Sequence, residues 1–136
     1  MTLVVDASAV IDLLVRSVRG DRVRGFLAER ADEDMATVAH LDAEVFSGLA
    51  RIHRAGHLDA DHVAELLGRL GDLAVTRLPI TTALLRAAWR LRDTISARDS
   101  LYVAAAAALS AGLITTDERL ARAVPDLAVD LEGDRP

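Results

Sequence analysis

The sequence contains no cysteine, and this absence excludes several kinds of site. Disulfide bonds, zinc–thiolate sites, iron–sulfur clusters and cysteine nucleophiles all require that residue. Lysine is absent too, because all 16 basic residues are arginines. A Walker A loop needs a lysine, as does an enzyme that forms a Schiff base, so both of these classes are also excluded.

Aromatic residues and long apolar runs are scarce as well. One Trp, one Tyr and two Phe are too few for a platform on which nucleic-acid bases stack. The apolar run over residues 101–114 is too short to cross a bilayer, and Ser110 and Gly112 interrupt it. The first apolar run carries Asp6 and Asp12 and has no preceding basic residue, which is atypical of a signal peptide. We therefore predict a cytoplasmic protein without a membrane segment.

What remains is typical of an ordinary globular chain. Its 136 residues are enough for one domain with a single substantial core, and 51% of them are hydrophobic and 27% charged. We predict one domain over residues 1–131 and a loose tail over residues 132–136. The formal net charge of −5 argues against a surface that grips nucleic acid as a whole. A polyanionic ligand would have to be met locally, by arginine or by a metal ion.

Short apolar runs alternate with helical patterns along the chain. Strands are expected over residues 3–5, 35–38, 75–80, 113–115 and 128–131. Helices are expected over residues 7–15, 21–30, 41–55, 60–70, about 82–91, about 99–109 and 118–123. Strands that alternate with helices favour a parallel sheet covered on both faces. We predict an α/β protein with three α/β/α layers and a central parallel sheet of four to five strands.

Four acidic residues are expected at one edge of this sheet. Asp6 closes the first strand and Asp117 follows the fourth, and ligands in such folds bind beyond the carboxyl ends of the strands. Glu44 and Asp99 each lie near the start of a helix, and helix starts lie at the same edge. Each close pair of carboxylates costs a few kcal/mol, even at an effective dielectric constant of about 20. One or two divalent cations would relieve that repulsion.

The chemistry of such a cluster follows from its oxygen atoms. Carboxylates without cysteine or an obvious histidine set suit Mg²⁺ or Mn²⁺ better than Zn²⁺. A cation held in this way can make its water more acidic and stabilise charge on a phosphoryl group, as phosphodiester hydrolysis requires. The sequence therefore raises the hypothesis of a metal-dependent site.

Each acid also has a purely structural explanation. Aspartate is a preferred helix N-cap, and Asp6 and Asp117 both stand just before a helix. Asp99 completes a capping box with Ser96, and Glu44 lies at the flank of an apolar stripe. Taken one at a time, these structural roles are favoured, and only convergence of all four side chains separates the two interpretations.

The histidines offer no separate metal site. His53 and His57 are spaced to share one helix face, but no third ligand accompanies them, and we assign both to the surface. His40 and His62 make no better case.

Four segments, in this order and at these separations, resemble a known pattern. They are VVDASAV at residues 4–10, AEVFSGL at 43–49, ARDSLYVAAAAAL at 97–109 and LITTDERL at 113–120. Together they resemble the PIN-domain ribonucleases and, among these, the VapC-type toxins of type II toxin–antitoxin systems. The resemblance covers nearly the whole chain.

The resemblance implies a site and a function. The metal-binding carboxylates that it implies are Asp6, Glu44, Asp99 and Asp117. The hydroxyl groups that would orient these carboxylates or a water molecule are those of Ser8 and Thr115. It implies cleavage of RNA that depends on Mg²⁺ or Mn²⁺, commonly of structured RNAs of the translation apparatus. It also implies a VapB-type antitoxin as partner and a homodimer.

Arg98 departs from the pattern, because many relatives have an uncharged residue immediately before the aspartate. Two roles stay open for it. It can contact a phosphate of RNA, or it can pair with Asp93 or Asp99 in the free protein.

Two other functions stay open beside RNA cleavage. An Asp-based phosphotransfer or phosphatase domain would place its nucleophile at Asp6, although receivers need a lysine and Ser8 stands where the phosphatases have a second aspartate. A PIN-like module that binds a partner without catalysis would retain the same acids.

Overall fold

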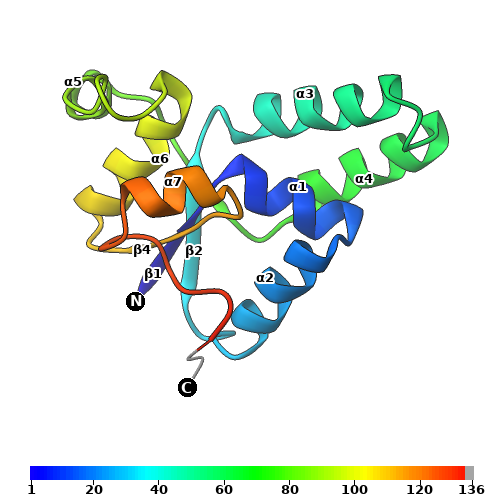
Figure 1. Ribbon diagram of the computed structural model, residues 1–136, viewed down its shortest axis with the longest axis horizontal. Helices are drawn as coiled ribbons and strands as arrows, with labels where there is room; N and C mark the ends of the chain where they lie inside the picture. Colours follow the sequence, from blue (N-terminus) through cyan, green and yellow to red (C-terminus); the bar gives the residue numbers. More distant parts are fainter. Residues whose placement is uncertain (134–136) are drawn as a thin grey trace.

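A parallel sheet of four strands forms the centre of the molecule (Figure 1). The computed structural model describes residues 1–133. The strands are β1 (Thr2–Val5), β2 (Asp34–Val38), β3 (Thr76–Leu78) and β4 (Gly112–Ile114), in the order β3-β2-β1-β4. β1 lies between β2 and β4, with Leu3 opposite both Met35 and Gly112. The first and last strands of the chain are therefore neighbours.

Helices cover both faces of the sheet, which confirms the predicted three-layer α/β/α fold. They are α1 (Ala7–Val15), α2 (Val18–Ala28), α3 (Leu41–Arg54), α4 (Ala60–Asp72), α5 (Thr82–Trp89), α6 (Ala97–Ala108) and α7 (Glu118–Ala123). On one side, α1 packs against α2, α3 and α4. On the other side, α6 packs on β1, β2 and β4, and α5 packs on α6 (Figure 1). No helix within residues 1–133 is long and apolar enough to cross a membrane.

The core explains why these segments take these places. Leu3, Val4 and Val5 are all buried, as a central strand with helices on both faces requires. The alanine-rich stretch of α6 is buried at residues 104–106, where small side chains let the helix lie close to the sheet. The parallel pairing of β1 with β2 and β4 places the residue after Val5 at the edge where the strands end.

Most predicted boundaries differ from the structure by one or two residues, and three elements differ in a more informative way. The strand expected over residues 128–131 is a single bridge between Leu113 and Ala128, so the sheet has four strands at the lower end of the predicted range. The strand expected over 75–80 is shorter, at Thr76–Leu78. Helix α2 begins at Val18 rather than residue 21, because the Ser17 hydroxyl caps it by accepting from the Gly20 amide at 3.0 Å.

The predicted tail over residues 132–136 is only partly visible. Residues 134–136 lie outside the described part of the chain. At its start, the Glu132 carboxylate accepts a hydrogen bond from the Arg22 guanidinium, with Oε1 and Nη1 2.7 Å apart.

Candidate active site

The four acids singled out in the sequence lie where the parallel strands end. Asp6 directly follows β1 and Asp117 follows β4 after two threonines. Glu44 lies in the first turn of α3, which follows β2, and Asp99 lies in the first turn of α6. Two of the four also cap helices, since Asp6 caps α1 and Asp117 caps α7. Capping and convergence are therefore both present, and neither excludes the other.

Asp6 is the buried centre of this edge, with only 2% of its surface exposed. Its Oδ1 atom accepts hydrogen bonds from the Ser8 hydroxyl at 2.7 Å and the Ala9 amide at 3.0 Å. Burial nevertheless raises the pKa of Asp6 to about 6, against the lowering effect of these donors and of the Thr115 hydroxyl, and the charge of Asp99 raises it further. The ionised carboxylate is thus under-compensated by the protein alone.

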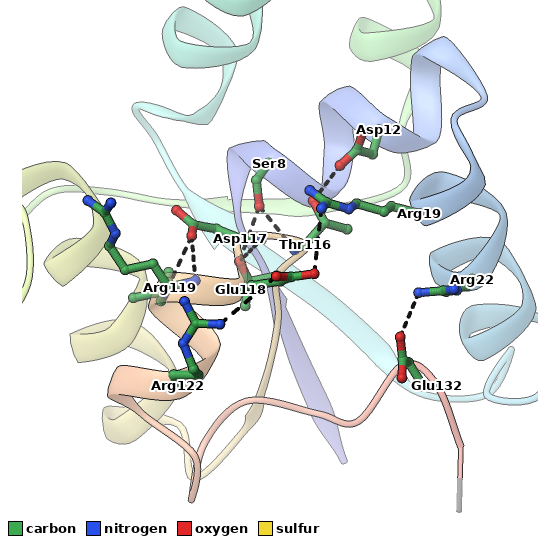
Figure 2. A network of polar contacts seen from close by, with 12 residues as sticks. Ser8, Asp12, Arg19, Arg22, Thr116, Asp117, Glu118, Arg119, Arg122 and Glu132 are labelled. Carbon is green, nitrogen blue, oxygen red and sulfur yellow. Dashed lines mark hydrogen bonds and ion pairs between the residues drawn. The ribbon is translucent and has the colours of Figure 1, made fainter. Parts of the chain in front are cut away.

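Hydroxyl groups join β4 to the start of α1 (Figure 2). The Ser8 and Thr115 hydroxyl oxygens are 3.1 Å apart, and Ser8 Oγ also accepts from the Thr116 amide at 3.1 Å. Thr115 Oγ1 accepts from the Asp117 amide at 3.1 Å. The two hydroxyls named in the sequence therefore connect the Asp6 carboxylate to the Asp117 backbone amide, while the Asp117 carboxylate accepts from the Arg119 and Leu120 amides.

Glu44 is held by two aromatic side chains. His40 Nε2 lies 2.9 Å from Glu44 Oε1, and the Tyr102 hydroxyl donates to the same oxygen at 3.2 Å. The His40 and Tyr102 rings are stacked, with centroids 4.4 Å apart. Burial raises the pKa of Glu44, but the hydrogen bond and charge of His40, with Tyr102 and Arg98, outweigh it, so that the net pKa is lowered. Glu44 is ionised and fixed through Oε1.

Asp99 links the acids electrostatically. Its pKa is raised, first by burial and then by the negative charges of Asp117 and Glu44, against the lowering effects of Ser96 and Arg98. The same Asp99 charge raises the pKa of Asp6. Carboxylates from β1, α3, α6 and the segment after β4 thus act on one another across a single region, as the topology predicted.

The donor set fits a hard divalent cation in chemistry and in charge. All four groups offer carboxylate oxygens, and burial leaves the charge of Asp6 under-compensated. Among residues 1–133, however, no three acidic or histidine side chains already stand close enough together to hold a metal ion. Binding of a cation by three or more of these groups would therefore require the carboxylates to move closer together. Repulsion between the carboxylates opposes that movement while no cation is present.

Sequence reasoning missed the role of His40 and left two roles of Arg98 open. His40 is not a surface histidine, since its side chain is 14% exposed and Nε2 also lies 3.1 Å from the Arg98 carbonyl oxygen. The suggested pairing of Arg98 with Asp93 or Asp99 is absent from the part of the chain that the structure describes. The i, i+4 spacing of His40 and Glu44 was the one local signal for this contact, whereas the other partners of His40, Arg98 and Tyr102, lie far along the chain.

A second missed group supports the hydroxyl network. The Thr116 hydroxyl donates to Asp12 Oδ2 at 2.5 Å, and the Ser17 hydroxyl donates to Asp12 Oδ1 at 2.8 Å. Asp12 therefore ties the segment after β4 to the end of α1 and the start of α2. Its only signal in the sequence is an acid on an otherwise apolar helix face.

Comparison with known proteins shows the family to which the chain belongs. The sequence profile described as "PIN domain" matches residues 3–124, a span that includes all four acids. The chain belongs to the PIN-domain family.

Within this family its relatives are VapC proteins. It is 46% identical over 123 residues to Ribonuclease VapC3 of Mycobacterium tuberculosis, covering 90% of this chain and 88% of that protein. It is 35% identical over 131 residues to Ribonuclease VapC1 of the same organism, covering 95% of each. The VapC-type resemblance predicted from the four segments is therefore confirmed.

Two crystal structures share the fold. Mycobacterium tuberculosis VapC20, titled a sarcin–ricin loop cleaving toxin, superposes with a TM-score of 0.67 at 17% identity, covering 89% of this chain and 94% of VapC20. PAE2754 from Pyrobaculum aerophilum gives a TM-score of 0.65 at 23% identity, covering 97% of this chain and 93% of PAE2754.

Proposed function

We propose that the protein is a metal-dependent endoribonuclease that hydrolyses phosphodiester bonds of RNA. The observation that carries the proposal is the mutual influence of the four carboxylates around Asp6, whose pKa is raised to about 6 by burial and by Asp99. A cluster that the protein leaves under-compensated is suited to a divalent cation. The ribonuclease names of the relatives at 46% and 35% identity support RNA as the substrate.

Mg²⁺ or Mn²⁺ would be held by carboxylates from four elements: Asp6, Glu44, Asp99 and Asp117. A bound cation of this kind supplies a more acidic water molecule and offsets the charge that develops on the phosphoryl group. The chain's own contribution is orientation. Ser8 holds Asp6 through Oδ1, and His40 and Tyr102 hold Glu44 through Oε1. Such supporting contacts tune metal ligands in proteins.

Arg98 is proposed to contact the RNA. Its side chain is exposed and forms no ion pair among residues 1–133, while its charge lowers the pKa values of Glu44 and Asp99. It therefore offers a guanidinium beside the carboxylates, where it can bind a phosphate oxygen.

The biological setting is also proposed from the relatives. VapC naming supports a toxin paired with a VapB-type antitoxin. A homodimer in the cytoplasm is part of the same proposal and rests on the family resemblance alone. The sarcin–ricin loop named for VapC20 is a reasonable first substrate to test, as one structured RNA of the translation apparatus.

Cleavage of labelled RNA tests the function directly. The purified chain is incubated with a sarcin–ricin hairpin and with total RNA, in Mg²⁺, in Mn²⁺ and in EDTA. We expect cutting with either metal, none in EDTA, and loss of at least about 100-fold in Asp6→Asn. Asp61→Asn, an exposed acid in the first turn of α4, is the matched control and should cut normally.

Two outcomes would contradict the proposal. A stable acyl-phosphate on Asp6 after incubation with acetyl phosphate would favour a phosphotransfer domain. Tight RNA or protein binding without any cleavage, in every metal tested, would favour a non-catalytic module.

A further inference from the structure

Two arginines from distant parts of the chain converge on one carboxylate beside Asp117 (Figure 2). Arg19 of α2 places Nη2 3.5 Å from Glu118 Oε1, and Arg122 of α7 places Nη1 3.9 Å from Glu118 Oε2. Each guanidinium thus faces a different oxygen of the same anion. The pair forms a clamp, Arg19 and Arg122, that is currently closed on Glu118.

The clamp lies in a groove that reaches the candidate active site. One cleft, of about 330 Å³, is lined by Arg19, Thr116 and Asp117 among others, and extends to Arg22. A second hollow of about 580 Å³ shares these three residues and adds Ser8 and Arg122. The two hollows together extend from the Ser8 hydroxyl and the Asp117 carboxylate to the clamp.

The closed clamp contributes little to the stability of the fold. The side chains of Arg19, Glu118 and Arg122 are 56%, 70% and 74% exposed, and both contacts are long. Exposed ion pairs of this kind are weak and are screened by salt. An incoming anion with better geometry can therefore displace Glu118 easily.

A phosphodiester is that better anion. It presents charged oxygens to which guanidinium groups bind with paired, charge-assisted hydrogen bonds. The groove also begins at Asp117, one of the four acids proposed to lie around the scissile bond, so a neighbouring phosphate of the same strand could lie along it. An acidic peptide would gain the charge contact alone, without this continuity with the site.

We propose that Arg19 and Arg122 form a subsite for a backbone phosphate of RNA next to the scissile one, and that Glu118 occupies the subsite until RNA displaces it. The inference rests on the proposed function and names where the substrate strand leaves the active site. It also gives an acidic chain a local cationic contact for a polyanionic substrate, because Glu118 offsets only one of the two arginine charges while RNA is absent.

Binding measurements test the subsite without relying on catalysis. Fluorescence anisotropy of a labelled single-stranded RNA is followed in EDTA for the full-length chain and for Arg19→Ala, Arg122→Ala and Glu118→Gln. We expect each arginine variant to weaken binding by roughly tenfold and to lower the slope of log K against log salt by about 0.7. Glu118→Gln should tighten binding, by roughly threefold.

The matched control is Arg69→Ala. Arg69 is an exposed arginine with its own ion pair to Glu65, at 2.6 Å on α4, and lies outside the groove. It should leave both the affinity and the salt slope unchanged.

The test depends on opposite changes in RNA affinity, which should fall in Arg19→Ala and rise in Glu118→Gln. If the three residues only fasten α2 to α7, Glu118→Gln and Arg19→Ala will lower the thermal unfolding temperature alike and neither will tighten RNA binding. That result, or arginine variants that bind RNA as Arg69→Ala does, would overturn the subsite. Failure of the proposed nuclease function would appear separately, as RNA that stays intact with the unmodified chain and Mg²⁺ or Mn²⁺.

Discussion

His40 Nε2 lies 2.9 Å from Glu44 Oε1 and 3.1 Å from the Arg98 carbonyl oxygen, so that one imidazole joins the start of α3 to the first turn of α6. Both neighbours are acceptors, and Nε2 therefore carries a proton. His40 Nδ1 is buried and has no hydrogen-bond partner among the described residues. Burial of an unpaired nitrogen costs free energy, and the His40 side chain is nevertheless buried here. We infer that its role is to hold Glu44.

Replacing His40 should therefore act through Glu44. His40→Phe keeps a ring to stack on Tyr102 but removes the donor, and we expect it to weaken Mn²⁺ affinity by roughly 10- to 100-fold in calorimetric titration. His40→Gln retains an N–H donor and should recover most of the affinity. His62→Phe, on the exposed face of α4, is the control. Equal affinities for His40→Phe and the unmodified chain would reduce His40 to a packing residue.

Asp6 should make the metal-free fold less stable as the pH rises. The pKa of Asp6 is about 6 in the folded chain and 3.8, the ordinary value for an aspartate, in the unfolded chain, so the folded chain binds more protons between these values. Stability is then lost as pH rises through that window, by on the order of 3 kcal/mol at ~1.4 kcal/mol per pKa unit. Asp6→Asn can still cap α1 and lacks this loss.

Urea unfolding in EDTA measures the difference. We expect Asp6→Asn to exceed the unmodified chain in stability at pH 7.5, and the gap to close towards pH 4. Asp59→Asn, which alters the exposed cap of α4, should show no such trend. A less stable Asp6→Asn at pH 7.5 would mean that the carboxylate is compensated by contacts that an amide cannot make.

Asp99→Asn should separate charge repulsion from capping. The Asp99 backbone amide donates to the Ser96 hydroxyl at 3.3 Å, so the cap of α6 survives the substitution. Removing a charge that burial, Asp117 and Glu44 all disfavour should leave the metal-free melting temperature unchanged or slightly higher. The rise in melting temperature on adding Mn²⁺ should shrink or vanish. Lower metal-free stability with a normal response to Mn²⁺ would return Asp99 to a structural role.

Gly20 is required where α2 crosses α1. A Cβ atom there would lie 2.0 Å from the Asp12 carbonyl oxygen, whereas a Cβ on Gly25 of the same helix would meet nothing within 4 Å. Gly20→Ala should therefore destabilise the fold by about 2 kcal/mol or more. Gly25→Ala, the matched control, should stabilise it by about 0.5–1 kcal/mol through helix propensity. Equal effects in thermal unfolding would show that α2 can shift away from α1 at no cost.

Elements with local signals could be predicted closely. Helix α1 begins and ends at the predicted residues because the Asp6 cap and the apolar spacing are both written into nearby positions. The start of helix α2 is three residues earlier than the sequence pattern indicates, because the first turn after the Ser17 cap carries the exposed Val18 and does not follow the apolar spacing of the buried face. The segment after Pro125 reads as a strand, yet it pairs with β4 at a single bridge.

Only the part of the candidate site that follows from the topology of the sheet could be predicted from the sequence. Parallel strands end at one edge, and this brings Asp6, Asp117 and the starts of α3 and α6 together in any such fold. The groups that hold these acids depend on packing between elements that are far apart in sequence. His40 meets Arg98 58 residues further on, and no period or motif in either segment records that contact.

The pairing of β1 with β4 has a consequence for the order of events during synthesis. The Asp6 amide donates to the Ile114 carbonyl at 3.1 Å, so the first acid takes its final surroundings only when the last strand is in place. A growing chain on the ribosome holds Asp6 and Glu44 long before Asp117 has been added. The complete set of four acids therefore exists only once translation has passed Asp117 and β4 has paired with β1.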